Sequence, residues 1–370
     1  MSEWKEYRLG DLLIIKYGKD HKKLGNGDIP VYGSGGIMRT GDAYLSDKPS
    51  VLIPRKGTLS NIFYVEEPFW TVDTMFWSEI NDSIVLPKYL YYAIKDYKWD
   101  SMNVGSAVPS LTVPVIESVS VSIPSIETQL RIAAQLSEID DKIAINRRIC
   151  ENLEAQAQAL FKHWFIDFAP FKDGKFIDSE LGMIPEGWRV GRLGDVADIT
   201  MGQSPAGSSY NEKGEGIFFY QGRTEFGFRY PSVRLYTTEP KRFAEPLSTL
   251  LSVRAPVGDI NVAIVRCCIG RGLASIKSNC SQHSYIYYLL LSMKRRFNVY
   301  NGEGTVFGSI NKDNLNGMSI VIPPISVTNS FDEIAKVIDN KILKAHQENL
   351  RLSTLRDTLL PKLMSGEIKV

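Results

Sequence analysis

An internal repeat constrains the fold of this chain more than any other feature of its 370 residues. The motif Trp-x4-Leu-Gly-Asp begins at Trp4 and again at Trp188. Residues 120–124 return as residues 319–323, and a long helical stretch follows each of these segments. Because a repeated sequence signals a repeated structural unit, we expect two copies of a globule followed by a helix.

The two globules have the sequence pattern of mixed α/β domains. Short apolar runs bounded by Gly and Pro, such as residues 51–53 and 260–265, predict strands. The aromatic segments 89–92 and 285–288 are long enough for a buried helix in each globule. The predicted fold class is α+β, with two mixed α/β domains joined by two long helices in a pseudo-two-fold repeat. The predicted segments are a first globule (1–124), a first helix (125–168), a connector (169–187), a second globule (188–325), and a second helix with a tail (326–370).

The two long helices carry the seven-residue apolar spacing of a coiled coil. Residues 125–165 and 326–360 contain no Gly or Pro, and helices of that length would span roughly 50–60 Å. We expect their apolar seams to face each other and to form a rigid spacer between the globules. In that arrangement Asn146 and Asn349 would be buried and would fix the register, while Arg356 would interrupt the second seam.

The alternative is that each helix packs on its own globule as an ordinary amphipathic helix. In the first helix, five residues in succession recur at seven-residue spacing, and this favours the paired arrangement. The expected seam positions are Leu136, Ile139, Ile143, Asn146, Leu153 and Leu160 in the first helix, and Ile338, Ile342, Asn349, Leu352 and Leu359 in the second.

None of the common catalytic motifs is complete in this sequence. The glycines at 33–36 favour a turn over a nucleotide-binding loop, because Met38 stands at the third glycine position and no helical run follows. Residues 36–41 have the spacing of a phosphate-binding loop, but Asp42 occupies the position of the required lysine. We therefore expect no catalytic residue and no bound cofactor on this chain.

The cysteines and the apolar runs indicate the cellular compartment of the protein. The four cysteines form no CxxC pair, which is typical of a reducing cytoplasm. Cys267, Cys268 and Cys280 could form a zinc site with His283, but Cys267 and Cys268 continue a strand-like run in which neighbours face opposite ways, so we expect buried thiols and no metal. No run of about 18 apolar residues and no basic-then-apolar N-terminal segment occurs, so we expect a cytoplasmic protein without a membrane partner.

The net charge of +1 hides an uneven distribution. The first globule carries 13 Lys+Arg against 15 Asp+Glu, a net of −2. Residues 189–325 carry 16 Lys+Arg against 10 Asp+Glu, a net of +6, and 11 of these cations are Arg; the helices and connectors account for −3. Arg reads guanine and phosphate with a planar fork, so this excess predicts a nucleic-acid partner.

Several basic and polar side chains lie in segments whose Gly, Pro and Thr residues predict loops at strand ends. Loops that place Arg beside Gln, Tyr and Ser suit base recognition, although a solvated surface charge is the alternative for each residue taken singly. The predicted DNA contacts are Lys16, Lys19, Lys22, Lys23, Tyr32, Ser34, Arg39, Arg55 and Lys56 in the first globule, and Gln203, Ser204, Tyr220, Gln221, Arg223, Arg254 and Arg271 in the second.

Longer motifs extend over the whole chain in one order. Residues 124–129, 139–143 and 160–168 resemble the central conserved region of the specificity subunit of Type I restriction-modification systems. Residues 184–188 resemble that family's entry into its second target-recognition domain, and residues 355–368 resemble its C-terminal signature. One departure is that residues 327–329 lack the Glu and Gln found at the start of the first helix.

This resemblance implies two target-recognition domains that each read one half of a bipartite double-stranded DNA site, held apart by an antiparallel pair of helices. It implies that the chain itself is not catalytic. Two methyltransferase (modification) subunits using S-adenosylmethionine would dock along it, and restriction subunits using ATP and Mg²⁺ would join them. The alternative function is a stand-alone DNA-binding or scaffold protein whose coiled coil pairs with a second copy.

Overall fold

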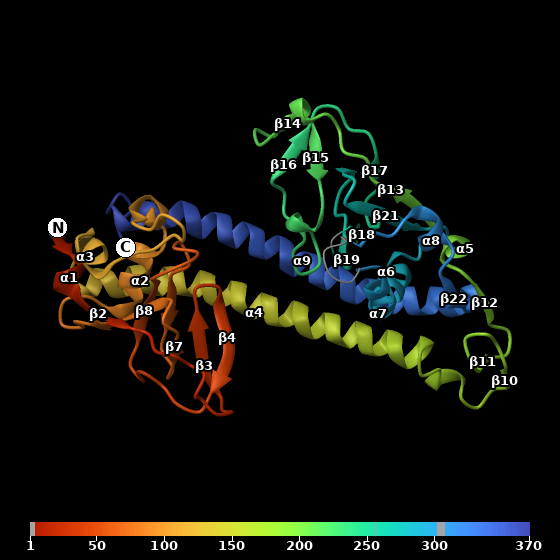
Figure 1. The fold of residues 1–370 in the computed structure, drawn as a ribbon, viewed down its shortest axis with the longest axis horizontal. Coiled ribbons are helices and arrows are strands. Elements are labelled where there is room, and N and C mark those ends of the chain that lie inside the picture. The colour runs from red at the N-terminus through yellow and green to blue at the C-terminus, as the bar shows by residue number, and fades with distance from the viewer. Residues whose placement is uncertain (1–3, 255, 302–307) are drawn as a thin grey trace. The chain divides into compact units, whose positions relative to one another are not determined.

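The computed structural model describes residues 4–254, 256–301 and 308–370 (Figure 1). The chain divides into two compact units. Unit 1 comprises Met1–Asn146 and Gln347–Val370, and unit 2 comprises Arg147–His346. Each unit therefore contains one globule and a part of each long helix. Within the described residues, none of the helices has both the length and the apolar character needed to cross a membrane.

Unit 1 is built on small β-sheets whose strands are mostly antiparallel. Its strands are β1 (Lys5–Arg8), β2 (Leu13–Tyr17), β3 (Ile29–Gly33), β4 (Gly36–Gly41), β5 (Ser50–Pro54), β6 (Phe63–Val65), β7 (Trp70–Thr71), β8 (Met75–Ile80) and β9 (Ser120–Ile123). One sheet has the order β2-β8-β5-β6, a second has the order β4-β3-β7, and β1 pairs with β9. Strands β3 and β7 run parallel. The strand expected at residues 51–53 is confirmed as β5, and the glycines at 33–36 form the expected turn between β3 and β4.

Short helices cover the sheets of unit 1. They are α1 (Leu9–Leu12), α2 (Pro87–Lys95) and α3 (Val113–Glu117). The aromatic segment 89–92 lies in α2, where Tyr89 and Leu90 are fully buried, as expected for a core helix. The Leu-Gly-Asp motif forms α1, and the Asp11 carboxylate accepts a hydrogen bond from the Arg8 backbone at the start of the helix.

Unit 2 repeats this topology. Its strands are β10 (Phe176–Ile177), β11 (Ile184–Pro185), β12 (Arg189–Arg192), β13 (Ala197–Met201), β14 (Tyr210–Asn211), β15 (Ile217–Tyr220), β16 (Leu235–Thr237), β17 (Phe243–Ala244), β18 (Thr249–Val253), β19 (Val257–Val262), β20 (Cys267–Ile269), β21 (Leu273–Ser278) and β22 (Ser319–Ile322). The order β13-β21-β18-β19 matches β2-β8-β5-β6, the pair β12-β22 matches β1-β9, and the parallel pair β15-β20 matches β3-β7.

The helices of unit 2 follow the same repeat. They are α5 (Leu193–Val196), α6 (His283–Ser292), α7 (Lys294–Phe297) and α8 (Lys312–Asn316). The aromatic segment 285–288 lies in α6 and is buried. The strand expected at residues 260–265 lies a few residues earlier in the structure, as β19 (Val257–Val262). The chain bends after Val262, before β20 starts at Cys267. Cys267 and Cys268 therefore lie on a strand of their own rather than continuing β19.

The long helices are α4 (Ile126–Phe165) and α9 (Ile325–Met364). The expected end of the second helix at residue 360 was wrong, because α9 continues through Pro361 to Met364. Leu360 and Leu363 are buried in the core of unit 1, and this burial offsets the backbone hydrogen bond that Pro361 cannot donate. The α+β fold class with its internal repeat is confirmed.

In unit 1, α4 and α9 run antiparallel and meet through a polar layer. The Asn146 side-chain amide donates to Asn349 Oδ1 at 3.0 Å and to Glu348 Oε2 at 2.8 Å. The Asn349 amide donates to the backbone oxygen of Ile143 at 3.3 Å. Arg356, which interrupts the apolar seam, pairs with Asp140 at 2.7 Å. Because buried amides are costly when unpaired, these contacts favour one register of the two helices.

In unit 2, the same two helices meet through apolar contacts. Phe331 of α9 packs edge-on against Phe161 and Phe165 of α4, with ring centres 5.6 Å and 5.1 Å apart.

The predicted seam positions of both units are all buried or half-buried. Those that are buried are Leu136, Ile143, Asn146 and Ile342, and those that are half-buried are Ile139, Leu153, Leu160, Ile338, Asn349, Leu352 and Leu359.

Each globule is fixed to α4 or α9 by a different polar contact. In unit 1 the buried Gln129 side chain accepts a hydrogen bond from the Leu86 backbone at 2.8 Å and donates to Ile84. In unit 2 the equivalent position lacks this glutamine. There Asn329 accepts from Gln282 at 2.6 Å, and Asp332 accepts from the Tyr285 backbone at 3.0 Å. The departure at residues 327–329 is thus compensated by other α9 side chains.

A buried ion network holds the loop 226–230 of unit 2 against the helices. Arg229 is 3% exposed and contacts the Glu154 carboxylate of α4, Asp339 of α9 at 2.7 Å, and the Tyr288 hydroxyl of α6 at 2.8 Å. Its guanidinium also lies 4.1 Å from the ring centre of Tyr287. Burial alone would lower the pKa of Arg229, but the tyrosines and carboxylates around it raise the pKa, so the guanidinium is charged.

Replacing Arg229 by Ala should lower the free energy of unfolding by about 3–5 kcal/mol, because the buried Glu154 and half-buried Asp339 carboxylates then lose their cation. Urea unfolding of the full chain measures this loss. The control is Arg266→Ala, which removes an exposed pair with Glu245 and a contact with the Phe243 ring, and it should cost about 1 kcal/mol. Equal losses in the two variants would show that the buried network does not stabilise unit 2.

Candidate nucleic-acid interface

Three loops of unit 2 converge where β13, β15 and β20 end. The Gln203 backbone donates to Ile269 at 2.9 Å, and Arg271 donates to the Ser204 hydroxyl at 3.2 Å. Gly272 donates to the Gln221 carbonyl at 3.3 Å. We call residues 202–204, 221–223 and 270–272 the unit 2 junction. It brings together five of the predicted contacts, namely Gln203, Ser204, Gln221, Arg223 and Arg271.

Close backbone packing makes the unit 2 junction rigid. A Cβ atom on Gly270 would lie 2.9 Å from the Gln221 Cα, and one on Gly202 would overlap the Gly270 carbonyl. Only glycine fits these positions, so the loops touch through their backbones. The side chains of Gln203, Gln221 and Arg271 are exposed around this contact. Rigid loops with exposed amide and guanidinium groups suit recognition of base edges.

The prediction of Tyr220 as a DNA contact was wrong. Tyr220 is 4% exposed and packs in β15 with Leu250, Ala263 and Cys267. Burial raises the pKa of its hydroxyl. The sequence signal failed because strand β15 extends to Tyr220, so the loop begins one residue later than the motif suggested.

Unit 1 contains the equivalent junction. The Lys19 backbone donates to Thr71 at 2.9 Å, as Gln203 does to Ile269 in unit 2. Val72 donates to the Tyr32 carbonyl at 3.0 Å, as Gly270 does to Tyr220. We call residues 18–19, 33–34 and 72–74 the unit 1 junction.

A basic loop of unit 1 adjoins its junction. Arg55 and Lys56 both donate backbone hydrogen bonds to Thr74, at 2.8 Å and 3.1 Å. Lys56 forms a β-bridge with Ser110, and Arg254 forms the matching bridge with Ser309 in unit 2. Lys56 and Arg254 are both exposed and occupy equivalent places in the repeat.

Other predicted residues of unit 1 have structural partners. Arg39 donates to the carbonyls of Leu24, Gly25 and Thr40, so its guanidinium supports the preceding loop rather than facing solvent freely. Lys16 pairs with Glu79 at 3.3 Å. The remaining predicted residues are Lys22 and Lys23, exposed in the loop before β3, half-buried Tyr32, whose pKa is raised by burial, and Ser34, whose carbonyl accepts from Asn61 at 2.8 Å.

One aromatic contact of unit 1 was missed at the sequence level. Tyr17 is 55% exposed at the end of β2, and the Arg55 guanidinium lies 5.4 Å from its ring centre. A large aromatic residue beside Lys16 and Lys19 was the available signal. Its exposed ring beside a guanidinium is typical of surfaces that stack on nucleic acid.

A basic groove of unit 2 was also missed. It has a volume of about 690 Å³ and lies between the C-terminal part of α4 and the α6–α7 segment. Lys162 of α4 lines one wall, and Lys294 and Arg295 line the other. A second hollow of about 340 Å³ shares Gln158, Leu291 and Lys294 with it and reaches Arg223. The basic triplet 294–296 after the aromatic helix was the signal for this groove.

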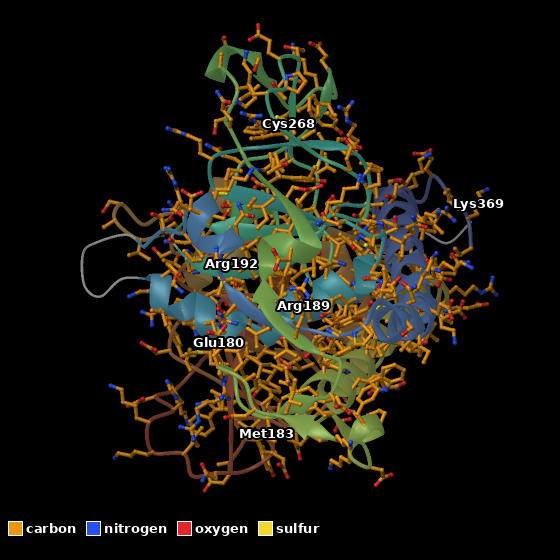
Figure 2. All side chains as sticks on the ribbon, turned by 90° about the vertical axis from the view of Figure 1, so that its right-hand side faces the viewer. Glu180, Met183, Arg189, Arg192, Cys268 and Lys369 are labelled. Carbon is orange, nitrogen blue, oxygen red and sulfur yellow. The ribbon has the colours of Figure 1, made fainter. Side chains whose placement is uncertain are left out.

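The unit 2 arginines do not all belong to one surface. Figure 2 shows Arg189 and Arg192 on β12, apart from Cys268 of β20, the strand that leads into the unit 2 junction. Arg189 pairs with Asp195 at 3.6 Å. The excess charge of the second globule therefore comes from separate sites.

The cysteine cluster has no metal-binding geometry. Cys267 and Cys268 are fully buried, whereas Cys280 is exposed. Burial raises the pKa of Cys267 to about 12, which favours the thiol over the thiolate that binds metals. Across residues 4–254, 256–301 and 308–370, no group of three or more His, Cys, Asp or Glu side chains could hold a metal ion.

Comparison with known proteins identifies the class to which this repeat belongs. Residues 1–155 and 185–355 match the family described as Type I restriction modification DNA specificity domain. The putative type I restriction enzyme MjaX specificity subunit of Methanocaldococcus jannaschii is 34% identical over 301 residues, covering 78% of this chain and 70% of that protein. The MjaIX specificity subunit of the same organism is 30% identical over 346 residues, covering 87% and 78%.

A solved structure has the same fold. The crystal structure of the Type-I restriction-modification system S subunit from M. genitalium superposes with a TM-score of 0.62 at 16% identity, covering 98% of this chain and 96% of that one. The chain belongs to the family of Type I restriction-modification specificity subunits.

Arg271→Ala should weaken binding to duplex DNA of any sequence and should reduce the slope of log affinity against log salt by about 1, because it removes an exposed cation that can contact phosphate. Arg189→Ala is the matched control, because Arg189 lies on β12 and outside the unit 2 junction. Fluorescence anisotropy over a salt series measures both slopes. A larger effect in Arg189→Ala would place the interface elsewhere on unit 2.

Proposed function

We propose that this chain recognises a bipartite double-stranded DNA site, with unit 1 reading one half and unit 2 the other. The observation that carries this proposal is the pair of equivalent junctions, built from the same strands in both units. Their exposed residues differ, since Lys19 corresponds to Gln203 and Asp73 corresponds to Arg271. Equivalent frames with different side chains fit two recognition sites of different sequence.

The paired helices would act as the spacer between the two half-sites. The Asn146–Asn349 layer and the Phe331 contacts each fix α4 against α9 within one unit. A register fixed in this way would set how many unread base pairs separate the halves of the site. The length of the helices would then determine the spacing of the DNA target.

The chain would serve as the non-catalytic DNA-recognition subunit of a larger complex. Two methyltransferase subunits would bind S-adenosylmethionine, and restriction subunits would use ATP and Mg²⁺ on their own chains. Membership of the specificity-subunit family supports these partners. Such a complex would act in the cytoplasm, where it meets the DNA of the cell.

A second candidate is a stand-alone DNA-binding or scaffold protein whose coiled coil pairs with a second copy. The seam observation weighs against it, because the predicted seam positions of α4 and α9 are already covered within each unit. Light scattering of the chain alone and after co-expression with the methyltransferase measures the mass of each assembly and distinguishes the two candidate functions. A dimer that does not bind methyltransferase would support the second candidate.

Exchange of residues 188–325 for those of a relative should change one half of the methylated site and leave the other half unchanged. The reason is that each junction lies within one globule. Sequencing of methylated adenines, in cells that express the chain with its methyltransferase, reports both half-sites. A change in both halves, or in neither, would contradict the assignment of one half-site to each unit.

A further inference from the structure

We propose that Asp259 is a specificity-determining residue of unit 2, because it positions the Arg223 guanidinium for one base and weakens binding to other DNA. This inference rests on the proposed DNA recognition by unit 2. It concerns a carboxylate that lines the second hollow, beside the cations Arg223 and Lys294. A surface that binds a polyanion would be expected to carry only cations there.

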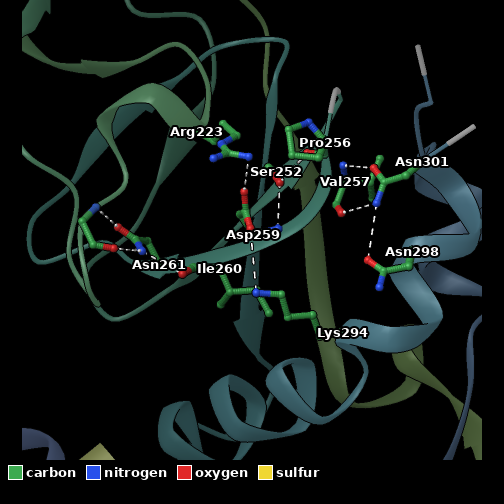
Figure 3. Close-up of polar contacts among 11 residues, drawn as sticks. Arg223, Ser252, Pro256, Val257, Asp259, Ile260, Asn261, Lys294, Asn298 and Asn301 are labelled. Atoms are coloured by element: carbon green, nitrogen blue, oxygen red, sulfur yellow. Dashed lines mark hydrogen bonds and ion pairs between the residues drawn. The ribbon is translucent and has the colours of Figure 1, made fainter. Parts of the chain in front are cut away.

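The backbone around Asp259 is held in place by a bulge. The pairing of β18 with β19 shifts register between Leu251 and Val253, which places Ser252 at the irregularity. The buried Ser252 hydroxyl donates to the Pro256 carbonyl at 2.8 Å and accepts from the Asp259 backbone at 2.9 Å (Figure 3). A bulge of this kind redirects a side chain from its regular place in a sheet. Here it accompanies a carboxylate that faces Arg223 and Lys294.

The Asp259 carboxylate contacts two cations from different elements (Figure 3). Its Oδ2 lies 2.9 Å from Arg223 Nη1, and its Oδ1 lies 3.9 Å from Lys294 Nζ. The Arg223 and Lys294 side chains are 51% and 61% exposed, so both can also reach a ligand. The pair uses Nη1 of Arg223. The Nε and Nη2 groups remain in position to form the two-donor fork that recognises guanine O6 and N7.

The position of Arg223 links the second hollow to the unit 2 junction. Arg223 begins the short 3-10 helix Arg223–Glu225, two residues after Gln221, whose carbonyl binds Gly272. The same Arg223 lines the hollow that includes Asp259 and Lys294. A DNA strand that reaches the junction would therefore pass the carboxylate.

The charge of Asp259 has two opposite effects on DNA binding. A fixed carboxylate limits the rotamers of Arg223 and so favours a base that fits its fork. The same carboxylate repels phosphate and offsets the positive potential of Arg223 and Lys294, which weakens binding to DNA that lacks such a base. The other carboxylate of this hollow, Glu154, already pairs with buried Arg229. Asp259 is thus the acidic group placed to discriminate between correct and incorrect DNA.

Asp259→Asn should weaken binding to the specific duplex and strengthen binding to an unrelated duplex. The ratio of the two affinities should fall by about 5- to 150-fold, the range that one bidentate base contact provides. The measurement is competition binding with the full chain assembled with its methyltransferase. In cells, the methylated motif should become degenerate at one base pair of one half-site.

Arg223→Lys is the second variant, because it keeps the charge but loses the planar fork. It should relax the same base pair as Asp259→Asn. Glu245→Gln is the matched control, since it removes the carboxylate from another exposed pair of unit 2, with Arg266 at 3.1 Å, and it should leave the motif unchanged. Thermal unfolding of each variant confirms that unit 2 is intact.

The proposal is overturned if Asp259→Asn keeps the wild-type motif and affinity ratio, or if Asp259→Asn and Arg223→Lys relax different base pairs. The second outcome would mean that Asp259 reads a base by itself. Failure of the proposed function looks different, because the wild-type complex would then show neither sequence-specific binding nor a bipartite methylated motif.

Discussion

The packing of α4 against α9 is the interaction on which the rest of the structure depends. Each unit is completed by a part of both helices, so neither globule has a full core without them. In unit 1 the contact depends on the Asn146–Asn349 layer, which tolerates one register. In unit 2 it depends on Phe331 packed against Phe161 and Phe165, a contact that buries large apolar surface. The polar layer that selects the register of the helices thus lies in unit 1, and the aromatic contacts that add stability lie in unit 2.

The globules are fixed to these helices by side chains that differ between the two copies. Tyr92 of unit 1 donates to Asp140, and Tyr288 of unit 2 donates to Asp339, at 2.8 Å and 2.9 Å. The cation that completes each cluster comes from a different element, Arg356 of α9 in unit 1 and Arg229 of a loop in unit 2. The repeat therefore preserves the carboxylate on the helix and the tyrosine on the globule. The arginine that pairs with this carboxylate comes from a different element in each unit.

Sequence patterns predicted the elements that have a regular residue spacing or an internal repeat. Heptad spacing located both helices and the Asn pair, and the repeat located the matching strands. The pattern failed where tertiary burial overrides a local signal. Pro361 suggested a helix end, but Leu360 and Leu363 are buried and extend α9 past it. Tyr220 looked like a loop residue, but it fills the core beside Cys267.

The candidate interface was predicted only in part, for a related reason. Residues flanked by Gly, such as Gln221 and Arg271, have a local sequence signal, and the structure places both in the unit 2 junction. Asp259 and Lys294 are 35 residues apart in the sequence, and both line the second hollow of unit 2. No spacing rule connects them, because the bulge at Ser252 and the bend after α6 bring them together in three dimensions.

Lengthening both helices by one heptad, between residues 146 and 147 of α4 and between residues 346 and 347 of α9, tests whether the helix pair sets the spacing of the DNA site. This insertion keeps the seam in register and adds about 10 Å, or about three base pairs of duplex. The chain is expressed with its methyltransferase, and the methylated adenines are mapped. If the helices are the spacer, the half-sites stay unchanged and are separated by about three more base pairs. Unchanged half-sites at the original spacing would contradict this role of the helices.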